Sequence, residues 1–190
     1  VSIVNRFVDA VNTYGVMPVK KTNMPGKNVN LSETKGDKFK YANIKTARLD
    51  GVKPKLHINY SDSPLGFNGE TKLVLPHKMY GFPFLDSKGE YGISNRDNYV
   101  IHDYNEEELC IIKEFLSTKT ALYIYEATRY RMKYLEKYAF LFLPDVTNIA
   151  GLVAKRPITD ETIASYFGLD ALDSMHIERL HKKTYDFEYS

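Results

Sequence analysis

Residues 118–145 read TKTALYIYEATRYRMKYLEKYAFLFLPD. The stretch begins with helix-forming residues, becomes densely basic and aromatic in its middle, and ends in an apolar run before Pro144. Basic residues interleaved with tyrosines are what a surface that holds phosphates and stacks bases requires. The same pattern is typical of an amphipathic helix whose tyrosines are half buried and whose basic heads reach into water. The sequence of this stretch alone admits both interpretations.

The middle of the stretch is predicted to be helical because its cations have a helical spacing. On a continuous helix, Arg129, Lys133 and Lys137 share one face, since they are four residues apart. Arg131 lies off that stripe, and Tyr130 begins a parallel row of tyrosines. The helix is expected to begin after residue 117 or 118. The apolar run at residues 139–143 contains no charge and therefore predicts a buried strand.

Capping signals predict further helices on both sides of this stretch. Asn105 precedes three glutamates, which is typical of a helix N-terminus. Thr159 is the expected N-cap of a later helix, with Asp160 and Glu161 in its first turn and Gly168 as its end. Another short helix is expected after that glycine. Cys110 is expected in the core, because it lies on the first of these helices between apolar residues.

The N-terminal part of the chain predicts one helix, a loop-rich segment and a β region. Residues 2–14 have helical apolar spacing and end at Gly15. Residues 16–51 are rich in Pro, Gly, Asn and Lys, with a short strand expected near residues 39–44. Strands are expected at residues 52–60, 71–77 and 98–102, and a hairpin is expected around the turn at residues 87–89.

This order of elements predicts an α+β fold, with a mixed or antiparallel central β region flanked by helices and a C-terminal helical segment. Residues 1–51 are expected to form an N-terminal helix plus a basic loop-rich segment, and residues 52–190 the α+β domain. The 190 residues suffice for a real core, with 43% hydrophobic and 26% charged residues. The single cysteine favours a reducing, cytoplasmic location, and no apolar run is long enough to span a membrane. The chain lacks an initiating methionine, so we expect a fragment as one alternative.

The small net charge of +2 conceals an asymmetry. Residues 1–60 contain eleven basic and four acidic residues and so carry +7, while the remainder carries −5. A basic half favours a polyanionic partner, although a solvated surface has the same composition.

Motifs that would indicate catalysis are absent from the sequence. The five histidines do not have the spacing of metal ligands, and no Walker loop or dinucleotide-binding glycine motif occurs. The polar segment SNRDN at residues 94–98 offers Asn95, Arg96 and Asn98 for base or phosphate contacts, or it is a surface turn.

Three of these segments together resemble the C-terminal region of restriction-modification type N6-adenine DNA methyltransferases, the TaqI-like enzymes and their viral relatives. The resemblance rests on FLSTK at residues 115–119, FLPD at residues 142–145 and the TDE helix at residues 159–169. KPKLHINY at residues 53–60 is similar to the strand that opens the specificity region of that family. The catalytic tetrapeptide of the family is absent, with SPLG at residues 63–66 as its nearest counterpart, and so is the glycine-rich S-adenosylmethionine motif.

The resemblance implies that this chain is the target-recognition part without the catalytic part. A methylase core, in the same polypeptide or in a partner, would bind S-adenosylmethionine and receive the flipped adenine. This chain would grip double-stranded DNA and read its sequence, with no catalytic residue, metal or cofactor of its own. The DNA-contacting residues that we infer for this role are Lys119, Tyr125, Arg129, Tyr130, Arg131 and Lys133, with Asn95, Arg96 and Asn98 as a second group.

Two other classes of function stay open at this point. One is a protein-interaction or scaffold module whose basic half is a solvated surface. The other is a small nuclease whose site the sequence does not reveal.

Overall fold

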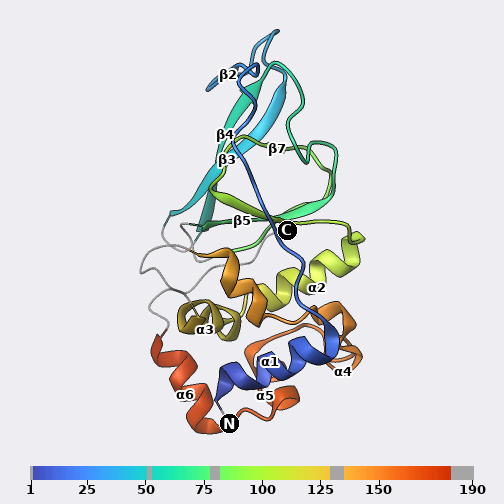
Figure 1. Cartoon of the computed structure of the whole chain (residues 1–190), viewed down its shortest axis with the longest axis vertical. Helices are drawn as coiled ribbons and strands as arrows, with labels where there is room; N and C mark the ends of the chain where they lie inside the picture. The colour runs from blue at the N-terminus through green and yellow to red at the C-terminus, as the bar shows by residue number, and fades with distance from the viewer. Residues whose placement is uncertain (1, 51–52, 78–81, 129–134, 181–190) are drawn as a thin grey trace.

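The computed structural model of the chain describes residues 2–50, 53–77, 82–128 and 135–180, and it has a β-rich half and a helical half (Figure 1). The elements in chain order are α1 (Ile3–Tyr14), β1 (Lys20–Lys21), β2 (Leu31–Ser32), β3 (Tyr41–Asp50), β4 (Lys53–Ser61), β5 (Lys72–Pro76), β6 (Phe84–Asp86), β7 (Gly92–Ile93), β8 (Asn98–Ile101), α2 (Glu106–Leu116), α3 (Lys119–Thr128), the 3₁₀ helices η2 (Lys137–Phe142) and η3 (Val146–Asn148), α4 (Ala150–Val153), α5 (Asp160–Phe167) and α6 (Ala171–Leu180). The predicted α+β class with C-terminal helices is confirmed.

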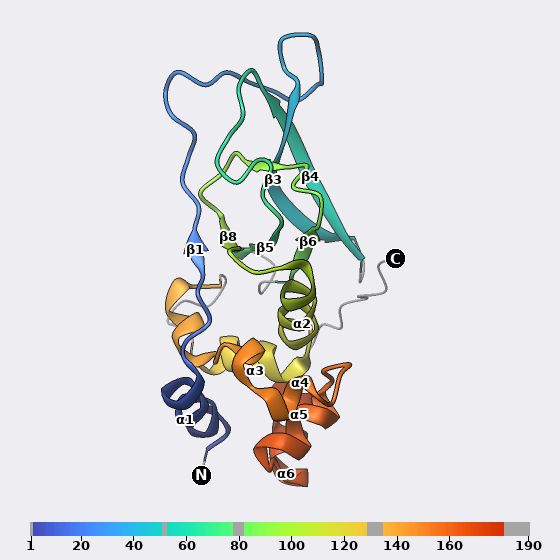
Figure 2. The same ribbon diagram turned by 90° about the vertical axis from the view of Figure 1, so that its right-hand side faces the viewer.

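Two four-stranded sheets build the β-rich half. The first has the order β1-β8-β5-β6 and is antiparallel. The second has the order β2-β4-β3-β7, and its short strand β7 runs parallel to β3. β3 and β4 form a long antiparallel ribbon, from Tyr41 opposite Ser61 to Asp50 opposite Lys53. Figure 2 shows this ribbon on the side of the sheets away from the helices. The expected boundary after residue 51 falls between these two paired strands.

Of the short strand expected at residues 39–44, residues 41–44 belong to the ten-residue strand β3. Its second half was not predicted because Lys45 and Arg48 break the apolar alternation. Pairing with β4 over the whole length of β3 supplies the order that the local sequence does not indicate.

The predicted helix ends in the described residues are confirmed by their capping contacts. The Ser2 side chain accepts the Asn5 N–H at the start of α1, which ends at Gly15 with φ 86°. Asn105 forms a capping box with Glu108 at the start of α2. Thr159 caps α5, which ends at Gly168 in the left-handed region. These signals lie within a few residues of the backbone groups that they satisfy, so the sequence alone suffices to place them.

The strand expected at residues 139–143 is wrong. Residues 139–142 belong to the 3₁₀ helix η2, in which the Ala139 N–H donates to the Glu136 carbonyl at 3.0 Å, and Leu143 is its extended C-cap. Ala139 and Phe140 are buried, whereas Leu141 is 55% exposed. A short apolar run does not distinguish a strand from a helical turn, and here the local i→i+3 bonds decide.

The hairpin expected around residues 87–89 is also wrong, although the chain does turn there. β6 pairs with β5 in one sheet, and β7 pairs with β3 in the other. A buried ion pair organises this branch point, because Lys72 Nζ lies 2.6 Å from Asp86 Oδ2 and both side chains are at most 3% exposed. The same carboxylate accepts the backbone N–H groups of Glu90 and Tyr91, which leads the chain away from β6.

The core of the helical half joins the N- and C-terminal helices. Phe7 of α1 stacks on Phe167 of α5 at 4.5 Å between ring centroids. Arg6 donates to the Phe167 and Gly168 carbonyls, both at 2.7 Å. Cys110 is half-buried rather than in the core. None of the described helices is long and apolar enough to cross a membrane.

Candidate nucleic-acid interface

The cationic centre of the stretch that predicted nucleic-acid binding lies outside the described residues. This applies to four of the inferred contacts, Arg129, Tyr130, Arg131 and Lys133. The expectation that Lys137 continues their helical stripe is wrong. α3 ends at Thr128, and Glu136 has extended backbone angles of φ −112° and ψ 146°, so Lys137 begins a separate helix.

Tyr125 does not have the surface position that base stacking requires. It is 1% exposed, and its ring packs edge-to-face against Phe140 at 5.5 Å. The helical pattern correctly places this residue on the apolar face of α3, and that face is turned into the core. The inference that Tyr125 stacks on DNA is therefore corrected: it is a core residue.

Lys119 lies at the N-terminus of α3, in the helical half. Its Nζ lies 2.8 and 2.7 Å from the two carboxylate oxygens of Glu178 on α6. This ion pair joins α3 to α6, and the Lys119 ammonium group therefore already has an acidic partner within the chain. Lys119 is therefore less available to a phosphate than a cation without an acidic partner.

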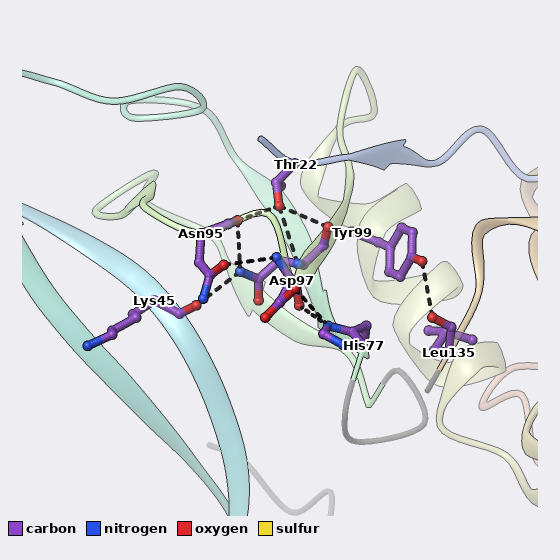
Figure 3. A network of polar contacts seen from close by, with 8 residues as sticks. Thr22, Lys45, His77, Asn95, Asp97, Tyr99 and Leu135 are labelled. Atoms are coloured by element: carbon purple, nitrogen blue, oxygen red, sulfur yellow. Dashed lines mark hydrogen bonds and ion pairs between the residues drawn. The ribbon is translucent and has the colours of Figure 1, made fainter. Parts of the chain in front are cut away.

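The segment SNRDN presents one of its three candidates to solvent. Asn98 is fully buried, and its Nδ2 donates to the carbonyls of Lys45 and Asn95 (Figure 3). Asn95 is half-buried, and its Oδ1 accepts the Asp97 N–H at 3.2 Å. Arg96 is exposed. The inference that Asn98 contacts DNA is corrected, because its amide holds this turn against β3 instead.

Arg96 lies at a basic hollow that segments far apart in the sequence form together. The hollow has a volume of about 430 Å³, and three cations line it, Lys21, Arg96 and Lys137. Tyr138, which is 73% exposed, lines it as well. The remaining described lining residues are His77, Asp97, Tyr99, Leu135 and Glu136. We call this set of residues the basic hollow.

A second depression adjoins the basic hollow and shares Lys21 and Lys137 with it. Its volume is about 630 Å³. Lys20 also lines it, and no acidic residue is among its described lining residues. Phe67 contributes an aromatic ring to its wall. The two depressions together form a basic surface with aromatic side chains, which is what a nucleic-acid backbone and its bases require.

Backbone pairing places Lys21 beside the turn that carries Arg96. Lys21 of β1 lies opposite Tyr99 of β8. The next residue, Thr22, has its Oγ1 2.6 Å from the Asn95 carbonyl and accepts the Asn98 N–H at 3.2 Å (Figure 3). The turn is thus held from two sides while its arginine stays free to meet a ligand.

Leu135 anchors η2 at the other side of the basic hollow. Its N–H donates to the His77 carbonyl at 2.7 Å, and its carbonyl accepts the Tyr99 hydroxyl at 3.1 Å (Figure 3). Burial raises the pKa of Tyr99 to about 12, and the negative charge of Glu136 contributes to the increase. The phenol is therefore protonated over the whole physiological range and acts as the donor.

The lysines of β1 were not identified as site residues from the sequence, where they counted only toward the basic N-terminal charge. Their neighbours in the basic hollow come from β8 and η2, about eighty and more than a hundred residues later. The local signal was limited to two lysines between Val19 and Thr22, which is also typical of an ordinary edge strand.

The described residues contain no group of three or more His, Cys, Asp or Glu side chains that could hold a metal ion. No protein-family model, curated protein or solved structure matches the chain.

Proposed function

We propose that this chain binds double-stranded DNA and serves as the target-recognition region of a restriction-modification type adenine-specific DNA methyltransferase. The observation that carries DNA binding is the convergence of Lys21, Arg96 and Lys137 around the exposed Tyr138. Each of these cations comes from a different element or turn, so a chance run of basic residues in the sequence does not explain their proximity. They would hold phosphates, and the tyrosine would stack or pack against a sugar or base.

The undescribed cations strengthen this proposal through their place in the sequence. Arg129, Arg131 and Lys133 directly precede Leu135, which lines the basic hollow. They would add phosphate or base contacts to those of the three described cations. Asp97 and Glu136 also line the hollow and would oppose a phosphate placed against them. A phosphate would therefore be expected against the three exposed cations rather than against these two carboxylates.

The methyltransferase role rests on the sequence resemblance. The chain lacks the family's catalytic tetrapeptide and its S-adenosylmethionine motif. S-adenosylmethionine and the methyl transfer are therefore assigned to a methylase core, in cis or in trans. The contribution of this chain would be to position a duplex so that one adenine enters that core.

Substitution of the three cations tests the DNA-binding proposal. The variant Lys21→Ala/Arg96→Ala/Lys137→Ala is expected to bind a duplex at least about a hundredfold more weakly at about 0.1 M salt, because three phosphate contacts are lost. The matched control is Lys88→Ala/Lys155→Ala/Arg179→Ala, which removes three exposed cations from outside the hollow. Equal affinities of the two variants would contradict the proposal.

Competition among duplexes tests the target-recognition part separately. The chain is expected to select one short sequence from a random duplex library. Its affinity for that sequence should be well above its affinity for the other duplexes. Binding without any sequence preference would overturn target recognition and leave DNA binding in place.

A further inference from the structure

The β3–β4 ribbon has a solvent-facing side on which two cations lie directly opposite each other. Arg48 of β3 is paired in register with Lys55 of β4, and both are exposed. The neighbouring pair on the same side is Thr46 with His57. The other side of the ribbon faces inward, because Ala47 is 3% exposed and packs in the core.

Facing like charges destabilise an antiparallel pair, since directly opposite Cβ atoms are only about 5 Å apart. Neither Arg48 nor Lys55 forms an ion pair with an acidic side chain in the part of the chain that the structure describes. Asp50 lies two residues further along the same side. The arrangement is therefore one that an external anion would stabilise.

The distribution of cations along the ribbon indicates an extended anion rather than a small one. Lys38 and Lys40 are exposed directly before β3 begins, and Arg48 lies near its other end. A ten-residue strand is about 33 Å long, which is the length of roughly ten base pairs of duplex. One phosphate cannot reach both ends, whereas a duplex backbone presents a charge at every step.

The ribbon is also joined to the basic hollow through the backbone of β3. The buried Asn98 amide donates to the Lys45 carbonyl at 3.2 Å, which fixes the Arg96 turn against β3 three residues before Arg48. A two-stranded ribbon has a size that the major groove of a duplex admits.

We propose that the β3–β4 ribbon is a second DNA-contacting element, in which Arg48 and Lys55 bind phosphates of the same duplex that the basic hollow holds. This inference rests on the proposed function, because it assigns the ribbon to that duplex. The ribbon contributes affinity and register through phosphates, and sequence choice remains with the hollow.

The test compares the salt dependence of duplex binding for Arg48→Ala/Lys55→Ala with that of the control Lys155→Ala/Arg179→Ala. Loss of two phosphate contacts is expected to make the slope of log K against log salt shallower by about 1.8, and to weaken binding at about 0.1 M salt at least tenfold. The charge-preserving variant Arg48→Lys/Lys55→Arg is expected to retain the slope of the unmodified chain.

The melting temperature shows whether the alanine variant is folded, and it is expected to stay equal or to rise, because a like-charge pair has been removed. If the alanine variant has the slope and affinity of the control while the unmodified chain binds DNA, the ribbon proposal is overturned and the proposed function stands. A failure of the unmodified chain to bind any duplex overturns both.

Discussion

The two halves of the molecule use their charged side chains differently. In the helical half two cations join separate segments through ion pairs, Arg156 with Glu114 at 2.6 Å and Lys119 with Glu178 at 2.7 Å. In the β-rich half, Lys45 is paired with Glu33 at 2.8 Å, but Arg48, Lys55 and Arg96 are exposed and form no ion pair with a described acidic side chain. Charges that stabilise the fold are paired within the chain, whereas exposed cations without such a partner favour an external polyanion.

The β-rich half also has one charge pair that serves the fold, and its loss is expected to have the largest effect. Asp86→Ala would leave Lys72 buried without its partner, at a cost of about 3–5 kcal/mol in the free energy of unfolding. Denaturant titration measures this change. The double variant Lys72→Met/Asp86→Leu should lose less, because no uncompensated charge remains, although both variants lose the hydrogen bonds from the Glu90 and Tyr91 N–H groups. An equal loss in both variants would show that these hydrogen bonds or packing, rather than the uncompensated charge, are responsible.

In the helical half, Asp160→Ala is expected to destabilise the chain without affecting DNA binding. The Asp160 carboxylate accepts the N–H groups of Lys119 and Thr120, at 3.1 and 2.8 Å, and so caps α3. Loss of such a cap costs about 1–2 kcal/mol. Thermal melts of this variant and of Asp160→Asn, which retains an acceptor, measure the effect. A large loss of DNA affinity at a temperature where the variant is folded would contradict the division between the halves.

Tyr99→Phe should have a smaller effect, at the contact between the two halves. The Tyr99 hydroxyl donates to the Leu135 carbonyl, and its loss is expected to cost about 1 kcal/mol. The pKa of Tyr99 is raised from 10.0 to about 12 by burial and by the charge of Glu136. The protonated Tyr99 hydroxyl therefore stabilises the fold fully below pH 10, and this contribution is lost as the pH rises toward 12. Between pH 10 and pH 12 the free energy of unfolding should fall less in the phenylalanine variant than in the unmodified chain. Identical dependence of the two proteins on pH would argue against this role of Tyr99.

The smallest effect is expected at the partly exposed pair of Glu114 and Arg156. Burial alone would raise the pKa of Glu114, but the hydrogen bonds from Arg156 and the Ile158 N–H outweigh it and lower the pKa below 4.5. The pair therefore stabilises the fold above that pH, and the contribution is lost as the pH falls below it. Glu114→Gln should cost at most about 1 kcal/mol at neutral pH, because the pair is still partly in contact with water and the glutamine keeps a hydrogen-bond acceptor. The difference in the free energy of unfolding between this variant and the unmodified chain should vanish in acid. A difference that persists there would contradict this role of the ion pair.

Local signals in the sequence predict much of the helical half. Asn105 and Thr159 cap the helices that they were expected to cap, because each meets backbone groups only two or three residues away. The α+β class follows from the same order of elements. Residues 139–143 show the limit, since a short apolar run is compatible with both a strand and a 3₁₀ helix.

Long-range pairing determines the candidate interface, and the sequence predicts it only in part. Arg96 was identified from its polar segment, but the burial of Asn98 follows from its contact with Lys45 on β3. Tyr125 was selected as an aromatic residue near cations, and its helix turns it into the core. Lys21 joins the site because β1 pairs with β8, which no local pattern indicates.

Duplex binding by the unmodified chain, measured as a function of salt concentration, tests the central claim most directly. The three cations of the basic hollow and the two of the ribbon predict at least five phosphate contacts, and hence a slope of log K against log salt of about −4.5 or steeper. Such a slope, with tight binding at low salt, is the expected result. No binding at low salt, or an affinity that does not change with salt, would contradict the assignment of the basic surface to DNA.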